Sequence, residues 1–182
     1  MISNILTSDE RSWETPPAFM EFLREQTGCN PSLDVAASSS NAKAPAFFDK
    51  SDDGLIQDWS GIVWMNPPFG RELPLWVDKA VEEYTFGNVE QIWILVPART
   101  DTAWFNRLWD FAARVWLVKG RLNFIHPLHG RSKGTRNSST FPSAVILLEA
   151  RIKRQRPDVD YLTPTLAERG YERPGDNRSP DI

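Results

Sequence analysis

The sequence of 182 residues is poor in the side chains that build covalent and metal-based frameworks. It holds one cysteine, Cys29, and two histidines, His126 and His129. A single thiol excludes an internal disulfide framework and an all-cysteine zinc site, and no acidic residue or cysteine lies near the histidines in the sequence. We therefore expect no metal site, and we expect Cys29 to pack as a small buried apolar residue.

Long hydrophobic runs are also missing. No apolar run approaches the roughly 18 residues of a membrane span, and residues 1–11 lack the basic and apolar regions of a secretory signal. We therefore expect a soluble protein of a reducing compartment, without a membrane partner. Hydrophobic residues make up 41% of the chain and charged residues 25%, so it can bury a core. Its length suggests one domain, and its oligomeric state is left open.

The chain as a whole has no excess of positive charge, but one segment of it does. The formal net charge is -3, and residues 1–98 carry 6 Lys/Arg against 15 Asp/Glu. Residues 99–137 reverse this balance, with 8 Lys/Arg against 2 Asp/Glu. Such asymmetry indicates either one basic face on an acidic body or a set of solvated surface charges.

Apolar runs of strand length alternate with amphipathic segments. The runs that we interpret as strands lie at 33–37, 62–65, 92–96, 115–118 and 144–148, with 121–125 as a further candidate. Helices are predicted from Thr15, which can cap the first turn, to Gln26, at 73–84, and from Asp101 or Thr102 to Ala113. This order predicts an α/β fold with a mostly parallel sheet that is covered by helices on both faces. We expect a flexible N-terminus at 1–12, one domain at 13–150 and a charged, disordered tail at 151–182.

The sharpest local signal is Asn66-Pro67-Pro68-Phe69, directly after the apolar run 62–65. The prolines end the strand and remove two N–H donors, which leaves the Asn66 side-chain oxygen and the Pro67 carbonyl as acceptors. Two such acceptors can take both hydrogens of an exocyclic amino group while Phe69 stacks on the ring that bears it. This arrangement favours a pyramidal nitrogen whose lone pair points at an electrophile, and it requires no strong base.

Other motifs surround this segment in a fixed order along the chain. They are 13–17 (WETPP), 33–38 (LDVAAS), 41–43 (NAK), 53–55 (DGL), 64–70 (WMNPPFG), 96–102 (VPARTDT) and 119–124 (KGRLNF). Together they resemble the phage-type DNA N6-adenine methyltransferase (Dam) family over residues 13–149. The resemblance implies a Rossmann-like methyltransferase fold, S-adenosylmethionine as the cofactor and double-stranded DNA as the substrate, with the target adenine flipped out of the stack.

The resemblance also implies roles for individual residues. The catalytic segment is Asn66, Pro67, Pro68 and Phe69, and the residues implied for the cofactor are Thr15, Pro16, Asp34, Ala36 and Ala37. Thr15 and Pro16 match the motif that contacts the methionine end of the cofactor. Too few residues lie between Ala37 and Ile62 for two full strand–helix units, so we expect a trimmed sheet. The acid that binds the cofactor ribose is then Asp49, with Asp52 and Asp53 as alternatives.

The basic segment supplies candidates for DNA contact. The stretch 126–138 is longer than a tight hairpin needs, and long ordered loops in compact domains are usually functional. We interpret it as a target-recognition loop that uses Arg131, Lys133, Arg136 and Asn137, with Arg99, Lys119 and Arg121 as further phosphate contacts.

Three other functions are compatible with the same residues. A protein-glutamine N5 methyltransferase and a DNA N4-cytosine methyltransferase would use the same pair of acceptors, and an inactive DNA-binding module would keep the basic face. The resemblance suggests a phage or prophage protein that acts in the cytoplasm of a bacterial host, with protection from restriction as its role.

Overall fold

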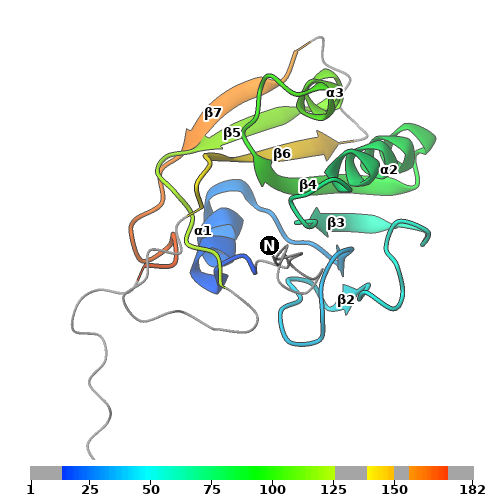
Figure 1. Cartoon of the computed structure of the whole chain (residues 1–182), viewed down its shortest axis with the longest axis horizontal. Helices are drawn as coiled ribbons and strands as arrows, with labels where there is room; N and C mark the ends of the chain where they lie inside the picture. Colours follow the sequence, from blue (N-terminus) through cyan, green and yellow to red (C-terminus); the bar gives the residue numbers. More distant parts are fainter. Residues whose placement is uncertain (1–13, 126–138, 150–155, 172–182) are drawn as a thin grey trace, which may run out of the picture.

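The computed structural model describes residues 14–125, 139–149 and 156–171, which contain a seven-stranded sheet and three helices (Figure 1). The helices are α1 (Pro17–Thr27), α2 (Leu73–Phe86) and α3 (Ala103–Phe111). The strands are β1 (Leu33–Asp34), β2 (Ala46–Phe47), β3 (Gly61–Met65), β4 (Val89–Pro97), β5 (Arg114–Val118), β6 (Ser143–Glu149) and β7 (Asp158–Leu162).

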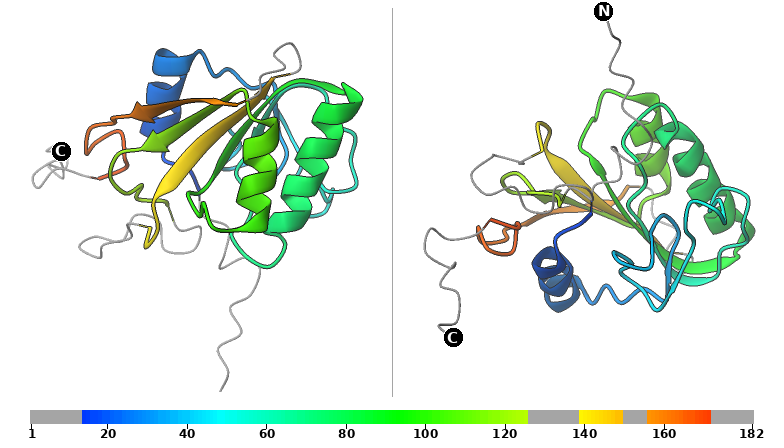
Figure 2. Two further views of the ribbon diagram at one scale, coloured as in Figure 1. Left: turned by 90° about the horizontal axis from the view of Figure 1, so that it is seen from above. Right: turned by 60° about the horizontal axis from the view of Figure 1, so that its bottom comes forward.

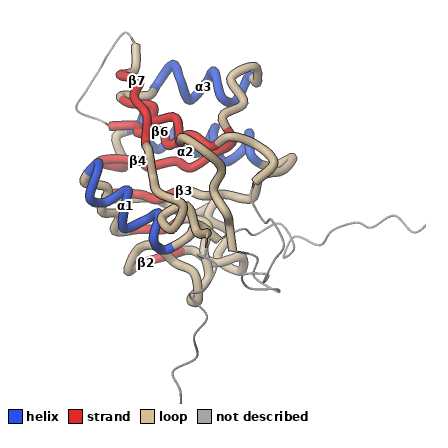
Figure 3. Tube along the Cα trace, turned by 90° about the vertical axis from the view of Figure 1, so that its left-hand side faces the viewer, coloured by secondary structure: helices blue, strands red, loops and turns tan. Residues whose placement is uncertain are grey.

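The strands follow the order β2-β1-β3-β4-β6-β5-β7 across the sheet, from β2 at one edge to β7 at the other (Figure 3). Every neighbouring pair is parallel except the two pairs that involve β6, which runs antiparallel to both β4 and β5. Strands β1, β3, β4 and β5 therefore all point the same way, and their carboxyl ends lie along one edge of the sheet. Ligands of such folds bind beyond that edge.

Helices cover both faces, as the sequence predicts. Figure 2 shows α1 on one side of the sheet and α2 and α3 on the other. The apolar sequence of β4 is explained by burial on both faces of the sheet. On one face, Ile92, Ile94 and Val96 pack into the core under α2 and α3. On the other face, Trp93 and Leu95 pack into the core under α1. A strand buried on both faces has no polar alternation.

Several local predictions are corrected by the structure. Thr15 does not cap α1, because the N-cap residue is Pro16 and no side chain caps this helix. Thr102 does cap α3, and its hydroxyl accepts a hydrogen bond from the Phe105 N–H. The candidate strand at 121–125 is absent, and Ile125 forms an isolated antiparallel bridge with Glu14 instead.

The prediction of a disordered tail at 151–182 is wrong for β7, which pairs in parallel with β5. Four of its five residues are exposed and only Leu162 is buried, which explains why the sequence shows no apolar pattern there. The chain then returns toward the body of the molecule, where the Asn123 N–H donates a hydrogen bond to the Arg169 carbonyl at 2.8 Å. The predicted flexible N-terminus at 1–12 lies outside the described residues.

Candidate active site

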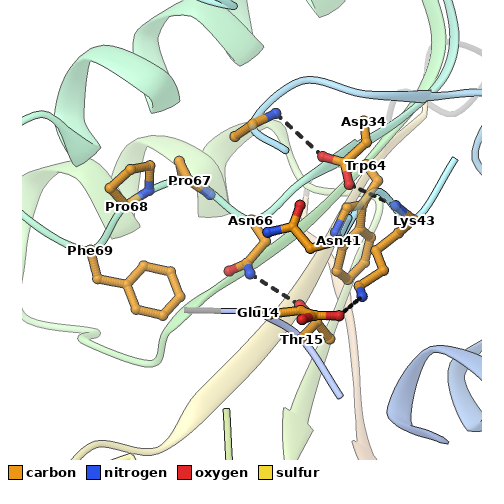
Figure 4. A pocket seen from close by; sticks show the side chains of 11 residues that line it. Glu14, Thr15, Asp34, Asn41, Lys43, Trp64, Asn66, Pro67, Pro68 and Phe69 are labelled. Carbon is orange, nitrogen blue, oxygen red and sulfur yellow. Dashed lines mark hydrogen bonds and ion pairs between the residues drawn. The ribbon is translucent and has the colours of Figure 1, made fainter. Parts of the chain in front are cut away.

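The carboxyl ends of β1 and β3 bring two segments of the sequence together. Asp34 pairs with Trp64 in the parallel ladder, and the Val35 N–H donates to the Trp64 carbonyl at 3.1 Å. Asn66 follows the end of β3 directly, so Asp34 and Asn66 leave the same edge of the sheet on neighbouring strands. A cavity of about 40 Å³ lies between them (Figure 4). Its lining is formed by Glu14, Thr15, Asp34, Ala36, Asn41, Lys43, Trp64, Asn66, Pro67, Pro68 and Phe69.

Thr15 holds the side-chain amide of Asn66. The Asn66 Nδ2 group donates to the Thr15 hydroxyl at 3.0 Å, across 51 positions of sequence, and Thr15 is 1% exposed. This bond fixes which end of the amide is the acceptor, and Figure 4 shows the Asn66 oxygen on the side of the amide that faces Phe69. The hydroxyl that was expected to cap a helix therefore orients the predicted catalytic side chain.

The Pro67-Pro68 turn places the Phe69 ring against two other aromatic side chains. The Gly70 N–H donates to the Pro68 carbonyl at 3.0 Å, which closes the turn. The Phe69 ring meets Phe124 and Phe141 edge to face, with centroid separations of 5.9 and 5.5 Å. Edge-to-face pairs contribute about 0.5–1.5 kcal/mol each beyond the burial of area, so the half-buried ring is held in place.

Asp34 organises the loop that follows β1. Its carboxylate accepts the Ala36 N–H at 3.3 Å and the Lys43 N–H at 3.0 Å, so it joins both ends of this loop. Asp34 is only 3% exposed, and burial raises its pKa from 3.8 to about 6, against the effects of the two backbone hydrogen bonds and the Lys43 charge. The carboxyl is therefore mainly ionised at neutral pH, and it orders the cavity wall.

Four lining residues were not predicted as site residues: Glu14, Asn41, Lys43 and Trp64. Lys43 Nζ forms an ion pair with Glu14 Oε1 at 2.7 Å, and the Asn41 Oδ1 atom accepts the Ser38 N–H at 2.7 Å. The signal that could have identified them was their position within the family-like motifs at 13–17, 41–43 and 64–70, where only the neighbouring residues were assigned roles.

A second, larger cavity of about 430 Å³ adjoins the first, and both are lined by Ala36 and Pro68. Its volume falls within the range of small-molecule sites, and its walls are mainly apolar with acids at the rim. The remaining lining residues are Val35, Ala37, Phe48, Asp49, Lys50, Asp53, Gly54, Leu55, Glu72, Leu75 and Trp76. A Cβ atom at Gly54 would lie 2.2 Å from the Val35 carbonyl oxygen, so only glycine fits at this point of the wall.

Asp49 lies at this second cavity, two residues after β2 and hence beyond the carboxyl end of the strand beside β1. Its Oδ1 atom accepts hydrogen bonds from the Ser51 hydroxyl at 2.6 Å and the Ser51 N–H at 2.7 Å. These bonds lower the pKa of Asp49 and fix its carboxylate. The alternative Asp53 also lines this cavity and accepts the Leu55 N–H at 3.2 Å.

The predicted DNA contacts are only partly within the described residues. Arg99 follows β4, and Lys119 and Arg121 follow β5, so all three exposed side chains leave the edge of the sheet that holds the cavities, although none of them lines either cavity. The remaining candidates, Arg131, Lys133, Arg136 and Asn137, and the whole loop 126–138 lie outside the described residues.

Residues 14–125, 139–149 and 156–171 contain no group of three or more His, Cys, Asp or Glu side chains that could hold a metal ion. Within the same ranges, no helix combines the length and the apolar character that crossing a membrane requires.

The mostly parallel sheet with one reversed strand, covered by helices on both faces, is a Rossmann-like methyltransferase fold. The sequence model of the DNA N-6-adenine-methyltransferase (Dam) family matches residues 2–170, and the chain belongs to that family. A relative in Escherichia phage T1, named DNA N-6-adenine-methyltransferase, is 34% identical over 112 residues. This match covers 60% of the present chain and 45% of the phage T1 protein, so the chain aligns with less than half of that relative's length.

Proposed function

We propose that this protein transfers a methyl group from S-adenosylmethionine to N6 of adenine in double-stranded DNA. The observation that carries the proposal is the Asn66–Phe69 segment at the mouth of a ligand-sized double cavity, in a chain of the Dam family. The name and phage origin of the similar T1 protein support the same activity and a phage or prophage protein in the cytoplasm of a bacterial host.

The two cavities fit the two ends of the cofactor. The larger, mainly apolar cavity suits a nucleoside, and the Asp49 carboxylate at its rim offers acceptors for ribose hydroxyls. The smaller cavity is lined by polar and charged side chains and suits an amino-acid end, with Thr15 and Asp34 among its walls. Ala36 joins the two cavities and, together with Ala37, lets a ligand approach the backbone closely. When bound, S-adenosylmethionine supplies an electrophilic methyl group on a positively charged sulfur.

The chain's own residues act mainly by positioning the adenine amino group. The Asn66 Oδ1 atom and the Pro67 carbonyl accept its two hydrogens, and the Thr15 hydroxyl keeps the amide oxygen on the correct side. Phe69, held by Phe124 and Phe141, supplies the face on which the flipped base stacks. Such prepositioned acceptors stabilise the transition state without a general base.

A transfer assay with three substrates tests the reaction. The protein is incubated with S-adenosylmethionine that carries a labelled methyl group and with adenine-containing duplex DNA, duplex DNA without adenine, or a glutamine-containing protein. Label should enter only the adenine-containing DNA. Incorporation into the adenine-free duplex would indicate an N4-cytosine target, and incorporation into the protein would indicate a glutamine target. DNA binding without any incorporation would indicate an inactive module.

We assign the contacts with the phosphate backbone of DNA to basic residues that follow the carboxyl ends of the strands or lie in the proposed recognition loop. The residues after the strands are Arg99, Lys119 and Arg121, and those in the loop are Arg131, Lys133 and Arg136. Replacing the three loop residues with alanine should flatten the log–log salt dependence of DNA affinity by up to about 2.7, at roughly 0.9 per phosphate contact. An unchanged affinity and salt slope would move the recognition surface to Arg99, Lys119 and Arg121.

A further inference from the structure

The Glu14–Lys43 ion pair lies in the wall of the smaller cavity, with both side chains partly buried. The Lys43 and Glu14 side chains are 10% and 22% exposed, and both line the cavity beside Thr15 and Asn66 (Figure 4). Each side chain projects from a fixed backbone. Glu14 exchanges two backbone hydrogen bonds with Ile125, at 2.9 and 3.0 Å, and the Lys43 N–H donates to Asp34 at 3.0 Å.

With the pair closed, the cavity measures about 40 Å³, which is room for a few water molecules. Opposite charges that are partly shielded from water favour keeping an opposite partner, since leaving such a charge unpaired is costly. A ligand that separates this pair must therefore replace both partners at once, with a negative group for Lys43 and a positive group for Glu14. An α-amino acid provides such a pair of charges, separated by one carbon atom.

We propose that Lys43 and Glu14 recognise the zwitterionic amino-acid end of S-adenosylmethionine by exchanging partners with it. The Lys43 ammonium group binds the α-carboxylate, the Glu14 carboxylate binds the α-ammonium group, and the ion pair between the two side chains separates. Each charge therefore has an opposite partner both before and after the ligand binds. The ion pair partners the two side chains in the absence of the ligand, and the ligand's own charges partner them in the complex. This inference rests on the proposed function, since it assumes that the cofactor occupies the two cavities.

Titration calorimetry with two ligands tests the exchange without requiring catalysis. S-adenosylhomocysteine carries the amino-acid end, whereas 5′-methylthioadenosine has the same nucleoside and thioether but lacks that end. Lys43→Met should weaken S-adenosylhomocysteine binding by about 10- to 100-fold, the range for losing a hydrogen bond to a charged group, and should leave 5′-methylthioadenosine binding within about twofold. Lys43→Arg keeps the charge and should restore most of the affinity.

The matched control is Lys79→Met. Lys79 forms an ion pair with Glu83 on α2, with side-chain exposures of 18% and 5%, and neither residue lines either cavity. This variant should bind both ligands as the wild type does. The double variant Glu14→Gln with Lys43→Met removes both charges, and it should still bind S-adenosylhomocysteine weakly, with a thermal unfolding transition that confirms its fold.

The possible failures are distinguishable. Equal losses for the two ligands in Lys43→Met would show that Lys43 only supports the fold of the cavity, and an unchanged S-adenosylhomocysteine affinity would show that the pair does not meet the ligand. Either result overturns the exchange and leaves the proposed function in place. Failure of the wild-type protein to bind either ligand would overturn the proposed function and, with it, the exchange.

Discussion

Replacing Thr15 with valine isolates the contact that orients Asn66. Valine has nearly the same shape as threonine, so the change removes the hydroxyl that accepts the Asn66 Nδ2 group at 3.0 Å and little else. Because Thr15 is 1% exposed, water has little access to replace the lost acceptor. An unsatisfied buried donor costs about 1–3 kcal/mol. Because Asn66 is half-buried, we expect the free energy of unfolding to decrease by an amount near the lower end of that range.

The effect on catalysis follows from the same hydrogen bond. A net contribution of about 0.5–1.5 kcal/mol to the orientation of the amide corresponds to a loss of roughly 2- to 10-fold in kcat. Single-turnover methyl transfer measures this loss, and thermal unfolding measures the change in stability. Thr15→Ser is the control, because it retains the hydroxyl and should retain most of the activity. Equal rates for the serine and valine variants would refute the orienting role, and a loss of helix content is not expected because Thr15 does not cap α1.

Three further predictions address the ring, the buried acid and the C-terminal segment. Phe69→Ala should lower turnover more than Phe69→Tyr, because base stacking contributes about 1–3 kcal/mol, and equal rates would leave Phe69 with a packing role only. Since burial raises the pKa of Asp34 from 3.8 to about 6, the folded state binds the proton more tightly than the unfolded state. The stabilisation that the protonated Asp34 carboxyl contributes to the free energy of unfolding should be full below about pH 4 and lost as the pH rises through 6. Urea unfolding measures this as the difference in unfolding free energy between the wild type and Asp34→Asn, and a difference that does not change with pH would contradict the prediction. Gly170→Ala should lower Tm, because Gly170 has φ +88° and the new Cβ would lie 2.7 Å from the Asn123 carbonyl oxygen and 2.9 Å from the Pro16 ring. An unchanged Tm would show that this segment does not support the site.

The elements that the sequence predicts well are those in which burial decides the residue type. The period-3.6 apolar stripe of α2 and the apolar runs of β3, β4 and β6 are consequences of packing against both faces of the sheet. The Asn66–Phe69 segment was also found, because it directly follows one of these runs and its chemistry is local.

The features that were missed depend on tertiary contacts. Strand β2 has only two residues, and β7 is an exposed edge strand, so neither carries an apolar pattern. The partner of Thr15 is 51 positions away and that of Lys43 is 29 positions away, and no local pattern specifies such distant hydrogen bonds. The helix-cap interpretation of Thr15 was wrong because Pro16 already provides the N-cap and the hydroxyl is used by Asn66.

The identity of the methylated atom tests the central claim most directly. Duplex DNA is incubated with S-adenosylmethionine and either the wild-type protein or Asn66→Ala, digested to nucleosides and analysed by mass spectrometry. The wild type should produce N6-methyldeoxyadenosine and no N4-methyldeoxycytidine. The Asn66→Ala variant should produce neither while retaining its affinity for S-adenosylhomocysteine, because Asn66 acts mainly in the transition state. Methylated cytidine from the wild type, or N6-methyldeoxyadenosine from Asn66→Ala at a near-wild-type rate, would contradict the account.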